Sequence, residues 1–132
     1  MILPSRSTKG SAGYDIYTPF DILAEPGEII KIPTGIKCMI DNCWVLEIVP
    51  RSSLGFKYGM RLNNTVGVID SDYYNNENNE GHIWIKFKND GNKMMKLKEG
   101  DRICQGLFIP FGITYDDNVD TERTGGFGST GN

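Results

Sequence analysis

Apolar residues recur at every second position in short runs along this chain, and turn-forming residues separate the runs. This spacing is typical of β-strands with one buried face, whereas long helices need a spacing of three to four. The clearest run covers residues 82–88, in which Ile83, Ile85 and Phe87 alternate with more polar residues. His82 is therefore expected on the more exposed face of that strand. Further strands, each close to a proline, are predicted over residues 28–32, 35–40 and 44–49.

A single short helix is predicted, covering one or two turns after Ser52 and Ser53, where a serine hydroxyl can cap the first free amides. The chain contains no visible internal repeat and no sign of a second folded domain. Residues 75–81 read Asn-Asn-Glu-Asn-Asn-Glu-Gly and predict a polar loop, of a length at which functional loops become common. The pattern as a whole predicts a single all-β domain.

The composition agrees with one compact domain and limits the cellular location and the partners that can be expected. The 132 residues are 39% hydrophobic and 23% charged, without an apolar segment long enough to cross a membrane. The first residues lack the basic region and apolar run of a secretory signal, which favours a cytoplasmic location. A net charge of -3 argues against general nucleic-acid binding, although a phosphorylated ligand needs only a local cluster of donors.

Cysteine and histidine usage limits the possible chemistry further. Cys38, Cys43 and Cys104 are odd in number and irregular in spacing, so neither a disulfide framework nor a zinc site is predicted. The thiols are expected to be packing residues. His82 is the only histidine, so any Ser-His or Cys-His mechanism would have to use it.

Two segments carry more polar side chains than packing requires, and one of them suits phosphate. Residues 50–55 put the guanidinium of Arg51 and the hydroxyls of Ser52 and Ser53 at the start of the predicted helix. Helix-start amides and an arginine fork both suit phosphate, although a capped helix with a surface arginine explains the same residues. Residues 12–15 end in Asp15, for which a tight strand entry with a surface carboxylate is the alternative interpretation.

A hairpin is predicted over residues 63–73, where it would present Asn64 to a base and Asp70 to a water molecule. An amide has a donor and an acceptor that match the imide edge of uracil, and a carboxylate can deprotonate a nucleophilic water. An ordinary turn rich in Asn and Asp remains the alternative. Asp70 and Asp72 are expected on opposite faces if the chain is extended there.

Residues 100–110 and the tail, residues 123–132, complete the polar segments. Asp101 and Arg102 are interpreted as an ion pair within a turn in preference to catalytic groups. The tail reads Arg-Thr-Gly-Gly-Phe-Gly-Ser-Thr-Gly-Asn, which combines glycines that approach phosphate closely with hydroxyl donors and an aromatic ring for a base. It is interpreted as a flexible arm that closes over a ligand, with a frayed terminus as the alternative.

Taken together, these segments resemble, in order and in separation, the five motifs of trimeric deoxyuridine triphosphate nucleotidohydrolases, the dUTPases. The resemblance spans nearly the whole chain and is carried by residues 12–15, 50–53, 67–73, 100–105 and 123–132. It implies a jelly-roll-like β domain over residues 1–122, a flexible arm over residues 123–132, and a homotrimer with active sites at subunit interfaces.

The resemblance also implies an activity and assigns residues to it. The activity is hydrolysis of dUTP to dUMP and pyrophosphate, in which Asp70 activates a water that attacks the α-phosphorus; it keeps uracil out of DNA and supplies dUMP for dTMP synthesis. Mg²⁺ across the phosphates is the implied cofactor, with Asp15 holding it through a water. Base and sugar contacts are assigned to Asn64, Gly67, Val68, Ile69, Tyr73 and Phe127. Phosphate contacts are assigned to Arg51, Ser52, Ser53, Gln105, Arg123, Gly128, Ser129 and Thr130.

The chain departs from the family pattern at three places. One residue, Thr124, separates Arg123 from the glycine pair where many members have two, which alters how Arg123 reaches the phosphates. Ser53 occupies a position where glycine is commonest. Residues 74–81 are longer than the usual connection and resemble an inserted loop of some bacterial and phage members, a natural surface for a regulatory protein partner.

Two alternative functions remain open at this stage. A dCTP deaminase shares the fold and binds a deoxynucleoside triphosphate, but the glutamate-bearing deamination motif of that family is not visible in the sequence. A regulatory or binding protein of the phage dUTPase type is the second alternative. Neither nucleic acid nor membrane is expected as a partner.

Overall fold

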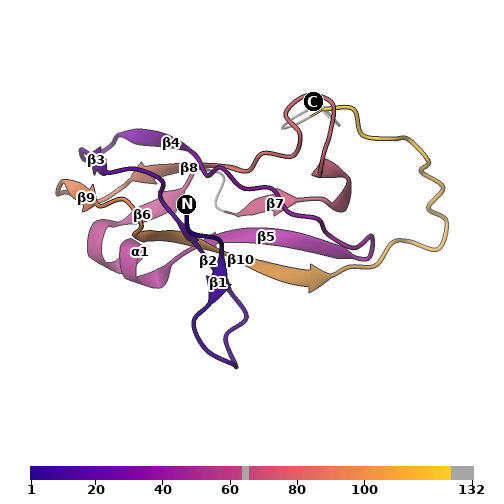
Figure 1. Cartoon of the computed structure of the whole chain (residues 1–132), viewed down its shortest axis with the longest axis horizontal. Helices are drawn as coiled ribbons and strands as arrows, with labels where there is room; N and C mark the ends of the chain where they lie inside the picture. The colour runs from indigo at the N-terminus through magenta and orange to yellow at the C-terminus, as the bar shows by residue number, and fades with distance from the viewer. Residues whose placement is uncertain (64–65, 126–132) are drawn as a thin grey trace.

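Short antiparallel strands, one α-helix and one 3-10 turn make up the computed structural model, which describes residues 1–63 and 66–125 (Figure 1). The helical elements are α1 (Ser52–Tyr58) and η1 (Ser71–Tyr73). The strands are β1 (Ser5–Arg6), β2 (Tyr14–Tyr17), β3 (Ile22–Ala24), β4 (Ile29–Pro33), β5 (Trp44–Pro50), β6 (Met60–Leu62), β7 (Gly67–Ile69), β8 (Trp84–Asn89), β9 (Met95–Leu97) and β10 (Arg102–Pro110). The predicted all-β class with at most one short helix is confirmed.

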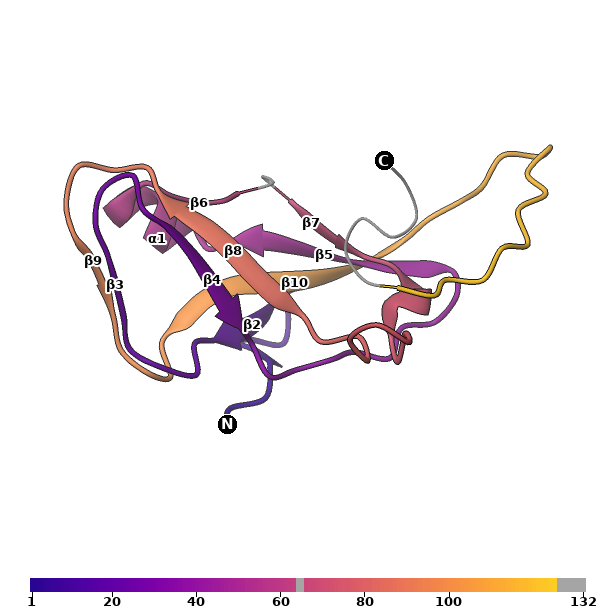
Figure 2. The same ribbon diagram turned by 90° about the horizontal axis from the view of Figure 1, so that it is seen from above.

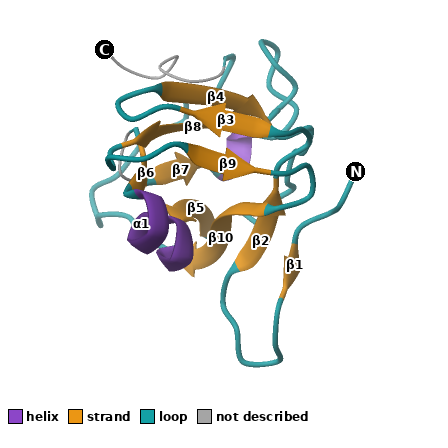
Figure 3. Ribbon diagram, turned by 90° about the vertical axis from the view of Figure 1, so that its left-hand side faces the viewer, coloured by secondary structure: helices purple, strands orange, loops and turns teal. Residues whose placement is uncertain are grey.

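Most of the strands belong to two sheets that form two layers. The larger sheet has the order β1-β2-β10-β5-β7 and the smaller one the order β4-β8-β6, while β3 pairs with β9. Each of these pairings is antiparallel. Seen from the end of the molecule, β4 and β8 lie above β5 and β10, and α1 lies beside the lower layer (Figure 3). This arrangement agrees with the expected jelly-roll-like fold.

The core lies between the layers and uses the side chains that the alternation assigned to the inside. Ile85 and Phe87 of β8 are buried, whereas Trp84 of the same strand is exposed. His82, just before the strand, is half-buried, as the alternation predicts. Each fully buried aliphatic or aromatic side chain stabilises the fold by roughly 1.5–3 kcal/mol. Other side chains with less than 2% exposure include Ile32, Ile48, Ile83, Met95 and Ile103.

Three of the four predicted strands are confirmed, as β4, β5 and β8, but the strand predicted over residues 35–40 is wrong. Gly35 has a φ of 77°, a left-handed conformation that ends the extended run at its start. Its N–H donates to Nε2 of His82 at 3.0 Å, and the carbonyl of Ile36 accepts from the N–H of Ile83 at 2.9 Å. Local contacts with residues 82–83 therefore replace a regular ladder.

The predicted helix is confirmed, but its predicted serine cap is wrong. Arg51 occupies the capping position with extended backbone, and no side chain caps the first amides by a hydrogen bond. The helix begins one residue earlier than a serine cap requires, so Ser52 is already its first residue. Gly59 ends the helix with a φ of 66°, and a Cβ there would come within 2.8 Å of the backbone of Gly91.

The cysteines are all free, and they differ in burial. Cys104 is buried as a packing residue, Cys38 is intermediate, and Cys43 is exposed, so the packing prediction is wrong for Cys43. In the described part of the chain, no helix has both the length and the apolar character that a membrane crossing requires.

Candidate active site

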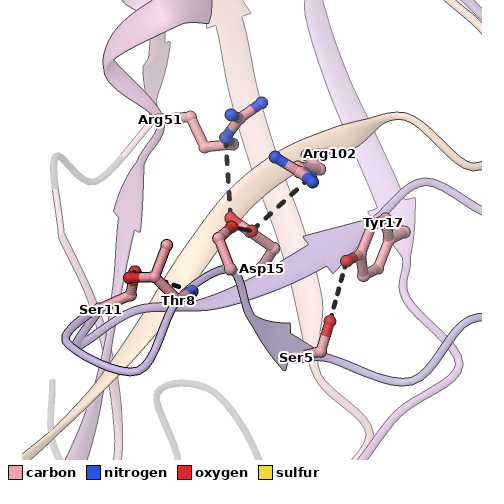
Figure 4. A network of polar contacts seen from close by, with 8 residues as sticks. Ser5, Thr8, Ser11, Asp15, Tyr17, Arg51 and Arg102 are labelled. Atoms are coloured by element: carbon pink, nitrogen blue, oxygen red, sulfur yellow. Dashed lines mark hydrogen bonds and ion pairs between the residues drawn. The ribbon is translucent and has the colours of Figure 1, made fainter.

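A buried carboxylate between two arginines organises one end of the larger sheet (Figure 4). Asp15 of β2 is 7% exposed, with Oδ1 at 3.7 Å from Nε of Arg51 and Oδ2 at 3.6 Å from Nε of Arg102. The hydroxyl of Ser7 donates to Oδ2 of Asp15 at 2.9 Å. One acid thus holds two guanidinium groups side by side, and arginine forks are well suited to phosphate oxygens.

The ion pair predicted between Asp101 and Arg102 is wrong. Arg102 is the first residue of β10, and the pairing of β10 with β2 brings its side chain to Asp15. Asp101 instead accepts a hydrogen bond from the backbone N–H of Lys98 at 2.8 Å and so closes the preceding turn. Arg102 therefore belongs to the candidate site, although the sequence did not predict it there.

A basic cleft opens beside this cluster. It has a volume of about 440 Å³, and its wall carries four basic side chains but one acidic side chain, Asp101. On a chain with a net charge of -3, this concentration of positive charge attracts a polyanion. The ammonium of Lys57 lies 5.2 Å from the centre of the Tyr58 ring, which keeps it along the cleft. The cleft is lined by Arg51, Ser53, Leu54, Lys57, Tyr58, Lys96, Leu97, Gly100, Asp101 and Arg102.

Two other predicted phosphate contacts lie close to this cluster. Gln105 stands opposite Asp15 in the pairing of β10 with β2. Gly13 lets Gln105 approach the neighbouring backbone, because a Cβ at position 13 would overlap the amide oxygen of Gln105. Ser52 is exposed at the start of α1. Predicted phosphate residues from two segments therefore meet around Asp15 at one end of the larger sheet.

A second cleft opens where β6 and β7 part. Among the described residues, the predicted hairpin over residues 63–73 shows no ladder of its own: β7 pairs with β5, and β6, which precedes it, pairs with β8. In Figure 2, β6 lies beside β8 and β7 beside β5. The cleft of about 450 Å³ is here called the base cleft, and it is lined by Lys31, Ile48, Leu62, Asn63, Gly67, Ile69, Asn78, Asn79, Trp84, Ile85 and Lys86. Apolar walls with a few amides suit a flat heteroaromatic base.

The predicted base-reading residues of β7 lie at the edge of the larger sheet. Only one side of an edge strand is paired, so backbone N–H and C=O groups along its other side remain available to a ligand. Gly67 and Ile69 line the base cleft, whereas the side chain of Val68 is 57% exposed and is not among the lining residues. Asn64 lies outside the described residues.

Asp70 and Asp72 both bind the side chain of Arg123. Nη2 of Arg123 donates to Oδ2 of Asp70 at 2.6 Å, and its Nε donates to Oδ1 of Asp72 at 2.7 Å. The expectation that the two carboxylates lie on opposite faces is wrong, because both bind the same guanidinium group. Side chains two residues apart share a face even of an extended chain, and η1 begins directly after Asp70. In this structure Arg123 is therefore engaged by the predicted catalytic carboxylate.

Tyr73 is placed inside the chain. It is 3% exposed, and its hydroxyl donates to the carbonyl of His82 at 2.6 Å and accepts from Nδ2 of Asn79 at 2.8 Å. This conformation leaves little of the ring surface for a sugar. The arm assigned to residues 123–132 is described only as far as residue 125, without regular secondary structure; Phe127, Gly128, Ser129 and Thr130 lie outside the described residues.

The structure does not bring Asp70 and Arg51 together within one chain. Leu46 pairs with Ile69, so Asp70 lies level with Val45 at the other end of β5 from Arg51. At about 3.3 Å per residue, the two levels are about 20 Å apart. Asp70 lines a cleft of about 650 Å³ with Ser71, Asp72, Phe111, Val119, Thr121, Glu122, Arg123 and Thr124, none of which lines the basic cleft.

The described residues offer no cluster of three or more His, Cys, Asp or Glu side chains for a metal ion. The carboxylate of Asp15 is already engaged by two arginines and Ser7. This donor set fits a Mg²⁺ ion that is carried by phosphate oxygens and water, with at most one protein carboxylate near it. Burial, and then the nearby charge of Asp15, raises the pKa of the Cys104 thiol, so this cysteine is no nucleophile for the site.

The two-layer β fold thus carries a basic cleft and a separate cleft of apolar side chains, amides and two lysines. The family model described as dUTPase matches residues 1–131, and the chain belongs to this family. It is 47% identical over 131 residues to the deoxyuridine 5'-triphosphate nucleotidohydrolase of Lactococcus lactis subsp. lactis strain IL1403, an alignment that covers 98% of this chain and 87% of the relative.

Solved structures agree with this family. The crystal structure of a dUTPase from Streptococcus mutans superposes with a TM-score of 0.78 at 44% identity, covering 85% of this chain and 88% of that chain. A dUTPase from phage phi11 of S. aureus, in which a structural Mg(II) ion is coordinated, has a TM-score of 0.74 at 22% identity, covering 91% and 90%. At that identity the phage protein supports the fold alone.

Some residues at these clefts escaped the sequence interpretation. Arg102 was assigned to a turn because its neighbour Asp101 offered a nearer partner, and only strand pairing reveals Asp15 as the partner. Asn78 and Asn79 were assigned to a loop of unknown role. The exceptional density of asparagine in residues 75–79 was the one available signal that this loop has a specific structure.

Proposed function

We propose that this chain hydrolyses dUTP to dUMP and pyrophosphate. The observation that carries the proposal is the pair of guanidinium groups that Asp15 holds at the basic cleft, on a chain whose other cleft suits a base. A nucleoside triphosphate has both a polyanionic end and a flat end. Membership of the dUTPase family supports uracil as the base.

Asp70 is the proposed activator of the water. A carboxylate that is about half exposed can both orient a water and accept its proton. The water then attacks the α-phosphorus, its proton passes to Asp70, and the bond from the α-phosphorus to the bridging oxygen breaks to release pyrophosphate. Asp70 can act only after it is available to the water, so the contact of Nη2 of Arg123 with its Oδ2 must loosen or rearrange when the nucleotide binds.

The phosphates are assigned to the residues gathered around Asp15. Arg51, Ser52, Ser53 and Gln105 are proposed to contact phosphate oxygens, and Arg102 joins them because Asp15 holds it beside Arg51. Base and sugar are assigned to Asn64, Gly67, Val68, Ile69, Tyr73 and Phe127. Arg123, Gly128, Ser129 and Thr130 are proposed to close over the phosphates as an arm formed by residues 123–132.

Mg²⁺ is the proposed cofactor, and when bound it neutralises charge on the phosphates and the leaving group. Asp15 is the residue that would hold it through a water. The residues of this chain supply the remaining requirements. Arg51 and Arg102 orient the phosphate chain, and Asp70 holds the proton taken from water.

A homotrimer with active sites at subunit interfaces is proposed as the working assembly. Asp70 and Arg51 lie about 20 Å apart in level along β5, so one chain alone does not place the proposed water activator beside the phosphate contacts. A surface for self-association is available at one end of β5 and β10, where Met39 is 75% exposed beside Trp44 and Phe108, which are 40% and 38% exposed. Docking of chains through this surface would allow Asp70 of one subunit to meet Arg51 of another.

Pyrophosphate release from dUTP, dTTP, UTP and dCTP tests the proposal most directly. We expect release from dUTP at a rate well above those for the other three nucleotides. Formation of dUTP from dCTP, without pyrophosphate release from dUTP, would replace the proposal with deamination. Truncation before Arg123 tests the arm, because a trimer that retains full activity without it would leave the tail with no catalytic role.

A further inference from the structure

The loop of residues 74–81, here called the asparagine loop, is held together by its own side chains. Asn76 is 5% exposed at its centre. Its Nδ2 donates to the carbonyl of Tyr73 at 2.7 Å and to Oδ1 of Asn79 at 2.8 Å. Its Oδ1 accepts from the N–H groups of Asn78 and Asn79, both at 3.0 Å. One buried amide therefore uses both donors and both acceptor positions inside the loop.

The backbone of the asparagine loop also closes on itself. Asn75 and Glu80 have left-handed φ angles of 56° and 62°, and the N–H of Asn75 donates to the carbonyl of Glu80 at 2.9 Å. Gly81 has a φ of 87°, and a Cβ there would come within 2.9 Å of the carbonyl oxygen of Tyr73. A loop with this many specific internal contacts has a defined shape, which it can present to a ligand without a large ordering cost.

Asn79 connects the loop to Tyr73. Its Nδ2 donates to the Tyr73 hydroxyl at 2.8 Å, while its Oδ1 accepts from the N–H of Gly81 at 3.1 Å. The same hydroxyl donates to the carbonyl of His82 at 2.6 Å, so Tyr73 is fixed from two sides. The residue proposed to lie near the sugar is thus oriented by the asparagine loop.

Asn78 differs from Asn76 and Asn79 because its side-chain amide has no hydrogen-bond partner among residues 1–63 and 66–125. It lines the base cleft together with Gly67 and Ile69, the strand residues proposed to read the base. Within the described residues its side chain makes no hydrogen bond, and it is exposed. Its backbone N–H is bound to Asn76, which fixes the position from which the side chain extends.

We propose that the asparagine loop forms a wall of the nucleoside site. Asn78 hydrogen-bonds the nucleoside moiety through its free amide, and Asn79 acts as a positioning residue that holds Tyr73 beside it. The inference rests on the proposed function, because it takes the base cleft as the place where the nucleoside binds. It makes the asparagine loop a part of the nucleoside site, and not a surface that binds a regulatory protein.

The first test is Asn78→Ala in the full-length protein, with Asn92→Ala as the matched control. Asn92 is also exposed and, within the described residues, its side chain makes no hydrogen bond. It lines a depression beside α1 and not the base cleft. Loss of one neutral hydrogen bond made equally in the ground and transition states should raise the KM for dUTP about 2- to 10-fold with kcat unchanged. The dissociation constant of dUMP should rise by the same factor in calorimetry, while that of pyrophosphate stays unchanged.

The second test separates the shape of the loop from the orientation of Tyr73. Asn79→Ala removes every bond of that side chain, whereas Asn79→Asp retains acceptors for Asn76 and Gly81 but loses the donor to Tyr73. The ring of Tyr73 is proposed to pack against the deoxyribose, where it would leave no room for the 2′-hydroxyl of UTP. We expect the melting temperature to recover from Ala to Asp, while the ratio of kcat/KM for dUTP over UTP stays about 2- to 10-fold below wild type in both. A purely structural role would restore that ratio together with the melting temperature.

The outcomes distinguish this inference from the proposed function. A wild-type protein that binds dUMP but releases no pyrophosphate from dUTP would overturn the proposed function, and the dUMP titrations would still decide the role of Asn78. Equal dUMP affinity in wild type, Asn78→Ala and Asn92→Ala would overturn the nucleoside contact. Recovery of the dUTP to UTP ratio in Asn79→Asp would overturn the positioning role.

Discussion

Two ionic clusters of opposite composition lie on this chain. In one, the carboxylate of Asp15 lies between Arg51 and Arg102, and in the other the guanidinium of Arg123 lies between Asp70 and Asp72. The side chain of the shared acid in the first cluster is 10% exposed, and the side chain of the shared base in the second is 9% exposed. The distances are 3.6 and 3.7 Å in the first but 2.6 and 2.7 Å in the second.

The difference lies in what holds each cluster. Asp15 lies on β2, and Arg102 is the first residue of β10. Arg51 lies between the end of β5 and the start of α1. Strand β10 pairs with both β2 and β5. The backbone ladder therefore fixes all three residues of the first cluster. Arg123 belongs to a segment without regular secondary structure, so only side-chain contacts hold it to Asp70. The first cluster is thus a preorganised binding surface, whereas the second is a contact that a ligand can displace.

Asp70→Asn should produce the largest effect. The amide retains the shape but cannot take a proton, so kcat for dUTP should fall by about 10²- to 10⁴-fold while dUMP binding persists. Asp72→Asn is the matched control, because it removes the same charge and one contact of Arg123. Similar losses of kcat in both variants would show that the charge of this cluster, and not proton transfer at Asp70, carries the effect.

Asp15→Asn should have the next largest effect, because two guanidinium groups lose their shared counter-charge and repel each other. We expect kcat/KM for dUTP to fall by about 10- to 100-fold, mostly through KM, as a phosphate-orienting site is lost. Steady-state kinetics and pyrophosphate inhibition measure this. Ser7→Ala is the control, since it removes one neutral donor to Asp15 but leaves both arginines in place. An unchanged KM in Asp15→Asn would contradict the preorganised cluster.

Arg123→Ala should change stability only slightly, despite its two short contacts. Its acidic partners are 53% and 54% exposed, and ion pairs with exposed partners contribute about 0–1 kcal/mol. Urea unfolding should therefore give a free energy within about 1 kcal/mol of wild type, and the difference should shrink in 1 M salt. A larger, salt-independent loss would mean that the second cluster is as firmly built as the first.

The smallest effect concerns the thiols. Since burial and the nearby Asp15 raise the pKa of Cys104, its thiol stays protonated and unreactive in the folded chain. A thiol reagent at pH 8 should modify Cys43 first, Cys38 more slowly and Cys104 only after denaturation, without loss of activity at the first step. Rapid modification of Cys104 would show that the region around Asp15 opens readily.

The two clusters were not equally predictable from the sequence. Asp15, Arg51 and Arg102 lie in separate segments, and no local pattern indicates that they share contacts. Asp101 beside Arg102 even suggested the wrong partner, because proximity in sequence competes with strand pairing. The relation of Asp70 to Asp72 was also mistaken, because side chains two residues apart share a face of an extended chain, and in the fold both carboxylates bind Arg123.

Local physics did determine much of the fold. The alternation of β8, the turns around the prolines and the single short helix depend on neighbouring residues alone, so the sequence was sufficient to predict them. The order and separation of the polar segments were likewise sufficient to indicate the dUTPase family, to which the chain belongs. The failure at residues 35–40 came from Gly35, whose left-handed backbone depends on contacts with residues 82–83 far away along the chain.

Tertiary structure alone decided which polar residues share a cleft. Pairing of β10 with β2 and β5 gathered the arginines around Asp15, and the parting of β6 from β7 opened the base cleft to Asn78. By itself, the sequence determined the strand pattern and the chemistry available to the protein. Sheet register determined where that chemistry meets, because hydrogen bonds between strands bring together residues that no spacing along the chain connects.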